Sequence, residues 1–319
     1  MSSERVQAAR TLLRALNGLG SRRAEWVWAS LSGAAGTLFR APTRRWTSSG
    51  DERVLVIAPH PDDEAVGCAG TLIRHHERGD LVRILFMTDG SRSRAFGFDV
   101  DSMRRLRQAE GARAAARMGA DCNWVGLREG DWSNEEGRSA IVRAFREINP
   151  TVVYAPSLID IHPEHRRIAK ILGTSLSEAV AEPEVRIYGA QVPLTPQLTN
   201  LVHDVSDLET AIASVFASYP SQSQSTMPMM RLRRYAARFY GAATQVEGFC
   251  AVQASTYASL QRRPPARFKA LSGRAWTDPL VLIVGLAERR AWGRAAHAQQ
   301  PQAANPTSPP PDTSPARLS

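Results

Sequence analysis

Short apolar runs alternate with amphipathic segments through the central part of the chain. The runs predict strands at residues 53–59, 82–88, 122–127, 151–156, 185–192 and 201–205. The intervening segments predict helices near 62–78, 101–118, 134–148 and 164–181, and further helices are expected at 207–218 and 228–240. This alternation is typical of βαβ units. We therefore predict a three-layer, Rossmann-like α/β fold, with a mostly parallel sheet and helices on both faces.

Composition divides the 319 residues into four segments. Residues 1–50 are predicted to form a basic helical extension, and residues 40–52 look like a linker. Residues 51–260 hold the predicted α/β domain, and residues 261–298 form a C-terminal extension. Residues 299–319 are rich in Pro, Ser, Gln and Ala, which is typical of disorder.

The net charge of +9 is concentrated at the two ends of the chain. Residues 1–50 and 261–319 each carry +6, which leaves −3 for the centre. A slightly acidic domain argues against nucleic acid as a partner. The basic ends are interpreted either as solvated tails or as contacts with an anionic membrane surface. Three unpaired cysteines and the lack of an apolar leader at the start predict a cytoplasmic protein, with peripheral contact at the inner face of a membrane as the alternative.

Two clusters of imidazoles and carboxylates follow predicted strands. Residues 58–64 read Ala-Pro-His-Pro-Asp-Asp-Glu, and residues 160–165 read Asp-Ile-His-Pro-Glu-His. Proline is favoured at the first helical position, so His60 and His162 are predicted helix N-caps. Ligands bind at the carboxyl ends of strands in open α/β sheets. The two clusters are therefore expected to face one shared site that suits a divalent metal and a general base.

These two motifs resemble those of the zinc-dependent sugar N-deacetylases related to N-acetylglucosaminyl-phosphatidylinositol deacetylase, the LmbE-like or PIG-L family. The resemblance covers roughly residues 52–255. Weaker similarities are Thr88-Asp89-Gly90, Arg107 with Glu110, and Ser221-Gln222 after Tyr219-Pro220. One departure is Glu164, which stands where the family has an aspartate.

The resemblance implies that His60, Asp63 and His165 are metal ligands. Two imidazoles and one carboxylate match a catalytic zinc site, which typically keeps a fourth position open for water. The same set is compatible with Fe²⁺. The alternative is that the two histidines serve only as helix caps.

Asp62 is not expected to be a metal ligand, because neighbouring side chains diverge and Asp63 is assigned to the metal. It is the candidate general base, and this role rests mainly on the resemblance. The alternative role for Asp62 is to stabilise the positive end of a helix dipole. His162 lies three residues before His165, so both can face one site. It is predicted to stabilise the tetrahedral oxyanion or to protonate the leaving amine.

The remaining site residues are assigned to substrate or to support. Arg107 resembles a family arginine that contacts substrate oxygens, and Glu129 is placed in a loop where it could accept sugar hydroxyl hydrogen bonds. Three further carboxylates are predicted to support the site from outside the ligand set: Glu64, Asp160 and Glu164. Outside the site, His75 and His76 are expected at a solvated helix end, and His203 is expected to be structural.

We therefore predict a zinc-dependent hydrolase that removes an N-acetyl group from an amino sugar in a glycoconjugate or a glycan-biosynthesis intermediate. One alternative is an amidase that acts on another N-acyl or thiol-conjugate substrate. The other is a non-catalytic, metal-bearing scaffold recruited to membranes by its basic ends, and the presence of Asp62 argues against it.

Overall fold

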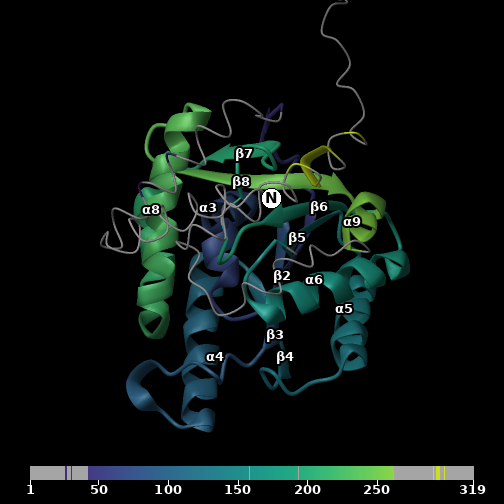
Figure 1. Ribbon diagram of the computed structural model, residues 1–319, viewed down its shortest axis with the longest axis vertical. Helices are drawn as coiled ribbons and strands as arrows, with labels where there is room; N and C mark the ends of the chain where they lie inside the picture. The colour runs from purple at the N-terminus through teal and green to yellow at the C-terminus, as the bar shows by residue number, and fades with distance from the viewer. Residues whose placement is uncertain are drawn as a thin grey trace, which may run out of the picture.

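The computed structural model describes residues 26, 30, 42–157, 159–192, 194–261, 290, 292–294 and 298. Within this part, eight strands form one sheet in the order β1-β7-β8-β6-β5-β2-β3-β4 (Figure 1). The strands are β1 (Arg44–Arg45), β2 (Arg53–Ala58), β3 (Leu81–Thr88), β4 (Asp121–Leu127), β5 (Val152–Pro156), β6 (Glu184–Tyr188), β7 (Leu201–Asp204) and β8 (Val246–Gln253). The helices are α3 (Asp63–Glu77), α4 (Val100–Arg117), α5 (Asn134–Ile148), α6 (Pro163–Ser175), α7 (Glu209–Phe216), α8 (Ser223–Tyr240) and α9 (Ala254–Gln261).

The order of the parallel strands places a crevice beside β2. Strand β2 pairs in parallel with β3 on one side and with β5 on the other, and β4 and β6 extend the parallel region. Strand β8 is antiparallel to both β6 and β7. The chain therefore moves outward from β2 to β4 and then returns to start β5 on the opposite side of β2. Such a switch point is where open α/β sheets bind ligands.

Helices cover both faces of the sheet. Helices α3, α4, α7 and α8 pack on one face, and α5, α6 and α9 pack on the other (Figure 1). Strand β2 contributes to both cores, because successive side chains of a strand point to opposite faces. Val54 and Val56 lie in the first core, and Leu55 and Ile57 lie in the second. The predicted three-layer α/β fold is confirmed.

Three parts of the chain outside the predicted strands also join the fold. The predicted linker contains β1, which pairs in parallel with β7, and it is followed by the buried Trp46. Strand β8 escaped prediction because Glu247 and Gly248 interrupt its apolar run; in the structure Glu247 is buried. Trp292, from the predicted C-terminal extension, is buried in the core beside α5, α6 and α9.

The two His-Pro motifs begin their helices differently. Helix α6 starts at Pro163 as predicted, and Nδ1 of its N-cap His162 accepts the Glu164 N–H at 3.3 Å. Helix α3 instead starts at Asp63 with Asp62 as its N-cap, so the prediction of His60 as N-cap was wrong. The reason is local: the Asp63 carboxylate accepts the N–H of His60 at 2.8 Å and closes a turn ahead of the helix.

His75 is buried, which contradicts the prediction of a solvated helix end for this residue. Its Nδ1 lies 2.5 Å from Asp80 Oδ2, and its Nε2 lies 3.0 Å from the Tyr154 hydroxyl. Glu52 and Arg186 complete the charged surroundings, at 3.4 Å from Nδ1 and Nε2 respectively. The cluster lies by the amino ends of β2 and β3, away from the crevice at their carboxyl ends. Glu52, His75 and Asp80 are close enough together to share one ion, but both ring nitrogens have partners within the protein and the Arg186 guanidinium lies beside the ring, so we interpret the cluster as structural.

Acid is expected to destabilise the fold through His75. Burial lowers the pKa of His75 from 6.5 to about 4, despite Asp80. Between these values the unfolded chain binds a proton that the folded protein does not, so stability is full above pH 6.5 and falls as the pH drops toward 4. The loss is about 3 kcal/mol for one such group. Urea unfolding of wild type and His75→Gln between pH 7 and pH 4 should show a shallower pH dependence in the variant. Equal slopes would contradict this role.

The ends of the chain lie almost wholly outside the described residues. This applies to the basic helices expected within residues 1–50 and to the disorder expected at residues 299–319. Among the residues that the structure does describe, no helix is both long and apolar enough to cross a membrane.

Candidate active site and metal centre

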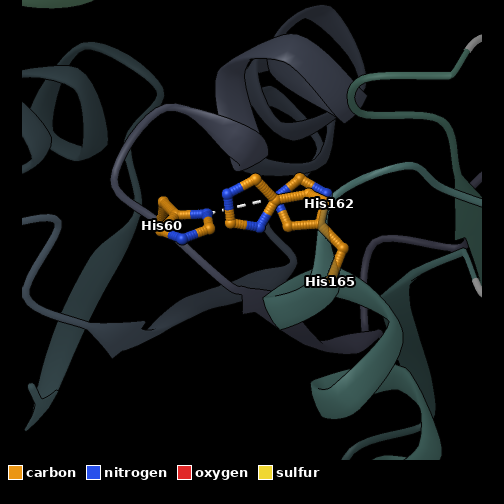
Figure 2. A group of neighbouring side chains, drawn as sticks. All are labelled: His60, His162 and His165. Carbon is orange, nitrogen blue, oxygen red and sulfur yellow. Dashed lines mark hydrogen bonds between the residues drawn. The ribbon is translucent and has the colours of Figure 1, made fainter. Parts of the chain in front are cut away.

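Three predicted ligands meet in the crevice between β2 and β5. His60 follows β2 and His165 lies in the first turn of α6 (Figure 2), while Asp63 opens α3. His60 Nδ1 is 3.1 Å from His165 Nε2, and Asp63 Oδ2 is 3.3 Å and 3.2 Å from these two atoms. All three residues are buried. The two motifs, far apart in sequence, thus place three donor atoms in a compact triangle.

This triangle fits a tetrahedral metal ion. Zinc bonds to nitrogen and oxygen are about 2.0–2.2 Å long, so donor atoms at tetrahedral angles are about 3.3–3.5 Å apart. The observed separations of 3.1–3.3 Å lie close to that value. The electrostatics agree. Burial opposes protonation, yet the neighbouring carboxylates of Asp63 and Glu129, which favour the protonated ring, raise the pKa of His60 to about 9. The potential between the imidazoles is therefore negative, and it favours a cation.

Carboxylates behind the imidazoles fix their orientation. Glu129 Oε1 lies 3.5 Å from His60 Nε2, and Asp160 Oδ2 lies 3.1 Å from His165 Nδ1. Each ring thus has one nitrogen toward the triangle and the other toward a carboxylate. Carboxylate–histidine pairs of this kind select the tautomer of a metal ligand and increase its basicity. Glu129, predicted to bind substrate, therefore lies against His60. Asp160, predicted to support the site, lies against His165.

His162 is the third imidazole of the cluster (Figure 2). Its ring centroid is 4.6 Å from that of His60 and 4.8 Å from that of His165. Nitrogen atoms of these three histidines also form a set close enough to share one ion. Because Nδ1 of His162 accepts the Glu164 N–H, the proton of the neutral ring is on Nε2. Burial, together with His60 and His165, lowers the pKa of His162 to about 3 and keeps the ring neutral.

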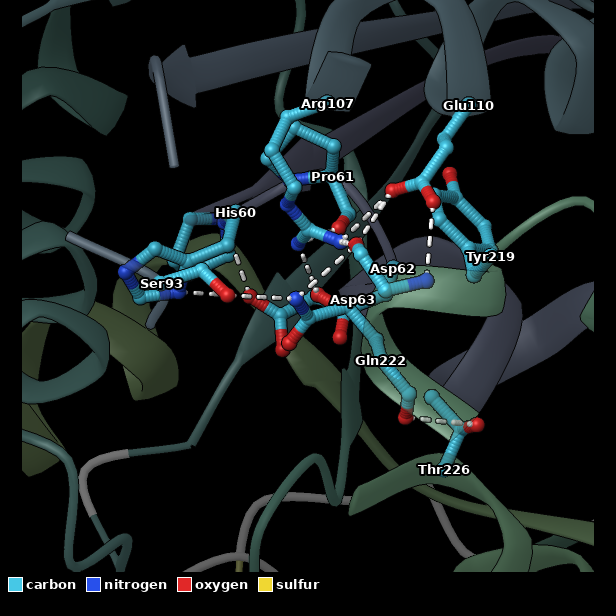
Figure 3. A network of polar contacts seen from close by, with 12 residues as sticks. His60, Pro61, Asp62, Asp63, Ser93, Arg107, Glu110, Tyr219, Gln222 and Thr226 are labelled. Carbon is cyan, nitrogen blue, oxygen red and sulfur yellow. Dashed lines mark hydrogen bonds and ion pairs between the residues drawn. The ribbon is translucent and has the colours of Figure 1, made fainter. Parts of the chain in front are cut away.

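Asp62 has an unusual backbone conformation next to the triangle. Its φ of 133° lies in a region that L-residues other than glycine rarely adopt. Arg107 holds this turn: Nη2 donates to Asp62 Oδ1 at 3.1 Å and to the carbonyl oxygen of Pro61 (Figure 3). Burial raises the pKa of the Asp62 carboxyl to about 6, although the Arg107 charge opposes this.

Arg107, predicted to contact substrate, is buried against the protein instead. It has 2% of its surface exposed, and its Nη1 lies 3.3 Å from Glu110 Oε2. Glu110 in turn accepts the backbone N–H and the hydroxyl of Ser221, at 2.9 Å and 2.6 Å. The Arg107 guanidinium is thus engaged by Asp62, Pro61 and Glu110. In this position Arg107 holds the Asp62 carboxylate in place.

Glu64 and Glu164 make buried contacts behind the site. Glu64 Oε2 accepts the N–H of Asp62 at 3.0 Å, and Oε1 is hydrogen-bonded to the Tyr219 hydroxyl. Glu164 accepts the Trp132 indole N–H at 2.9 Å. Both side chains thus tie the first turn of a helix to a distant segment.

An open pocket adjoins the triangle. Its lining comes from the segment after β3 and the loop after β4: Ser91, Arg92, Ser93, Arg94, Gly97, Phe98, Val100, Arg128, Glu129 and Asp131. Glu129 belongs both to this lining and to the surroundings of His60. Glu129 therefore connects the pocket to the surroundings of His60.

Tyr219 and Trp132 were not singled out as site residues from the sequence. Tyr219 is fully buried, packs beside Arg107 and bonds to Glu64. The sequence signal nearest to Tyr219 is the Tyr-Pro-Ser-Gln segment, a weak similarity to the family. Trp132 lies after a glycine-containing loop that carries no periodic pattern, so its contact with Glu164 depends on tertiary structure alone.

Residues 55–175 match the family model described as PIG-L, GlcNAc-PI de-N-acetylase. A probable N-acetyl-alpha-D-glucosaminyl L-malate deacetylase 2 of Bacillus anthracis is 30% identical over 141 residues, which are 41% of this chain and 60% of that protein. A diacetylchitobiose deacetylase of Thermococcus kodakarensis is 32% identical over 121 residues, which are 36% of this chain and 45% of that protein. The matches thus span about half the length of these relatives. The family resemblance of the two motifs is confirmed.

The fold has a counterpart among solved structures. The N,N'-diacetylchitobiose deacetylase of Pyrococcus horikoshii aligns with a TM-score of 0.57 and 22% identity. The alignment covers 64% of this chain and 85% of that one. At this level of identity the likeness concerns the fold.

Proposed function

We propose that this chain, whose residues 55–175 belong to the PIG-L family, is a metal-dependent N-deacetylase of amino sugars. The observation that carries the proposal is the triangle of His60, Asp63 and His165, with donor atoms 3.1–3.3 Å apart beside the Asp62 carboxylate. The relatives named above support it, because both are deacetylases whose names specify N-acetylated sugars. Zinc suits a donor set of two imidazoles and one carboxylate, and Fe²⁺ suits it as well.

The metal would be held by His60, Asp63 and His165, with Glu129 and Asp160 orienting the rings. When bound, it would supply Lewis acidity that polarises the acetamide carbonyl and makes water a nucleophile near neutral pH.

Asp62 would act as the base. Its carboxylate takes a proton from the water that attacks the carbonyl carbon. When the C–N bond breaks, the same proton is returned to the leaving nitrogen, so that the products are acetic acid and the amine, which at neutral pH become acetate and the protonated amine. Arg107 would hold the carboxylate in its strained position, where Oδ1 is 3.1 Å from the guanidinium.

His162 would stabilise the developing oxyanion. Its Nδ1 accepts a backbone N–H, so Nε2–H is the group that can donate to a negatively charged oxygen. This arrangement favours oxyanion stabilisation over protonation of the amine, since a neutral imidazole has no extra proton to give.

The substrate would enter through the pocket lined by Arg92, Arg94, Phe98 and Glu129. Acetate release from N-acetylglucosamine and N,N'-diacetylchitobiose tests the proposal. N-acetylated amino acids and N-butyrylglucosamine are the comparison substrates. Turnover of the N-acetyl sugars above the others is expected. Preference for another acyl group or for a non-sugar amide would favour the broader amidase alternative, and no turnover of any substrate would favour the scaffold.

A further inference from the structure

Helix α3 is interrupted a short distance after the metal site. Cys68 has φ −154° and ψ 24°, values outside the helical region, within an otherwise continuous helix. The interruption separates the turn that carries Asp63 and Glu64 from the longer half that follows. The direction of that first turn, and with it the direction of the Asp63 carboxylate, is therefore set at this point.

A buried ion pair takes the place of a helical backbone hydrogen bond at the interruption. In a regular α-helix the N–H of Gly70 would bond to the carbonyl of Val66. Here the Gly70 N–H donates to Glu247 Oε1 at 2.9 Å, and the Val66 carbonyl accepts from Arg233 Nη2 at 2.5 Å. Arg233 Nη1 and Glu247 Oε1 are themselves 2.7 Å apart. The pair thus stands between a donor and an acceptor that would otherwise bond to each other.

Further contacts attach the same pair to both halves of the helix. Glu247 Oε2 accepts the backbone N–H and the hydroxyl of Thr71, at 2.8 Å and 2.6 Å. Arg233 Nη2 also donates to the carbonyl of Ala65 at 3.0 Å. Glu247, from β8, therefore caps the second half of α3, and Arg233, from α8, satisfies carbonyls of the first half.

Stability alone is a weak reason for such a pair. The side chains of Arg233 and Glu247 have 8% and 0% of their surface exposed. Burying two charges carries a desolvation penalty, and the attraction between the charges often does no more than offset it. Well-packed apolar residues in the same place frequently give the protein the same stability. The best-attested use of buried ionic groups is to select one arrangement among several.

We propose that Arg233 and Glu247 are positioning residues for the metal site: they hold the interruption of α3 that directs Asp63 toward His60 and His165. The inference rests on the proposed metal centre. The first turn has little room to adapt, since a Cβ at Gly67 would lie 2.5 Å from the Tyr188 ring. Metal–ligand distances must be met within about 0.2 Å, so a small rotation of this turn weakens binding.

Arg233→Met tests the proposal through zinc affinity, measured on the full-length folded protein by competition with a chromophoric chelator. Removal of orienting groups around a metal site weakens binding about 10- to 100-fold, and we expect a loss in that range. Arg233→Lys, which retains the charge but not the forked geometry, should recover part of the affinity. Glu247→Gln provides a second variant if Arg233→Met does not fold.

Arg186→Met is the matched control. Arg186 is an equally buried arginine that contacts Glu52, Glu184 and Tyr154 near the amino ends of the strands. Its loss should lower the melting temperature and leave zinc affinity unchanged. Equal zinc affinities for wild type, Arg233→Met and Glu247→Gln would overturn the positioning role, and so would an equal loss in Arg186→Met. Failure of the wild-type protein itself to bind zinc would instead overturn the metal centre.

Discussion

Asp62→Asn should lose most of its turnover and keep its metal. The substitution preserves shape and can still accept a hydrogen bond from Arg107, but an amide cannot take a proton from water at neutral pH. General base catalysis contributes about 10²–10⁴-fold, so kcat for acetate release should fall by that factor. Metal content per protein, measured by elemental analysis, should match that of the wild type.

Asp121→Asn is the control for this variant. Asp121 is an exposed carboxylate at the amino end of β4, with 70% of its side chain accessible, so its substitution should leave kcat unchanged. Near-wild-type turnover of Asp62→Asn with metal bound would exclude Asp62 as the base. Its strained backbone would then need another explanation.

His165→Ala should lose metal and activity together. The variant removes one corner of the triangle, leaving Asp63 and His60 3.3 Å apart without the third donor. Loss of a residue that only orients a ligand typically weakens metal binding 10- to 100-fold, so removal of the ligand should exceed about 100-fold. The loss of zinc affinity in Asp160→Asn should lie in the 10- to 100-fold range, because Asp160 faces the nitrogen of His165 that points away from the triangle. Zinc competition titrations measure the loss of affinity in both variants. A larger loss in Asp160→Asn than in His165→Ala would contradict the assignment of His165 as a metal ligand.

His162→Ala distinguishes two possible ligand sets for the ion: the triangle of His60, Asp63 and His165, or the three histidines of the cluster. If His162 acts on the oxyanion, the variant keeps its metal and loses kcat. If the three imidazoles hold the ion, the variant loses metal as His165→Ala does. The hydrogen bond from the Glu164 N–H to Nδ1 predicts the first result.

The main features of the candidate site could be predicted because they are local in sequence. Each His-Pro motif follows a strand, and because β2 and β5 are parallel their carboxyl ends lie at the same edge of the sheet. His60 and His165 therefore converge although 105 positions separate them. The three layers of the fold could be predicted because apolar runs typical of strands alternate with amphipathic segments typical of helices.

The remaining features depend on tertiary contacts that no local pattern encodes. Arg107 reaches the turn at Pro61 across 46 positions, and its buried guanidinium contacts Asp62. The late helix position of His75 gave no sign of its partners Asp80 and Tyr154. Glu247 has the appearance of a loop residue in sequence, since a charge beside a glycine argues against a buried strand. It binds backbone N–H groups at the interruption of α3, and that interruption exists only in the assembled fold.

Reconstitution of acetate release with metal tests the central claim most directly. The full-length protein is stripped with a chelator, checked by elemental analysis, and titrated with zinc while acetate release from N,N'-diacetylchitobiose is followed. We predict no turnover in the stripped protein and recovery that saturates at one zinc per chain, with no recovery in His165→Ala. Full turnover by protein verified to contain no metal would contradict the account.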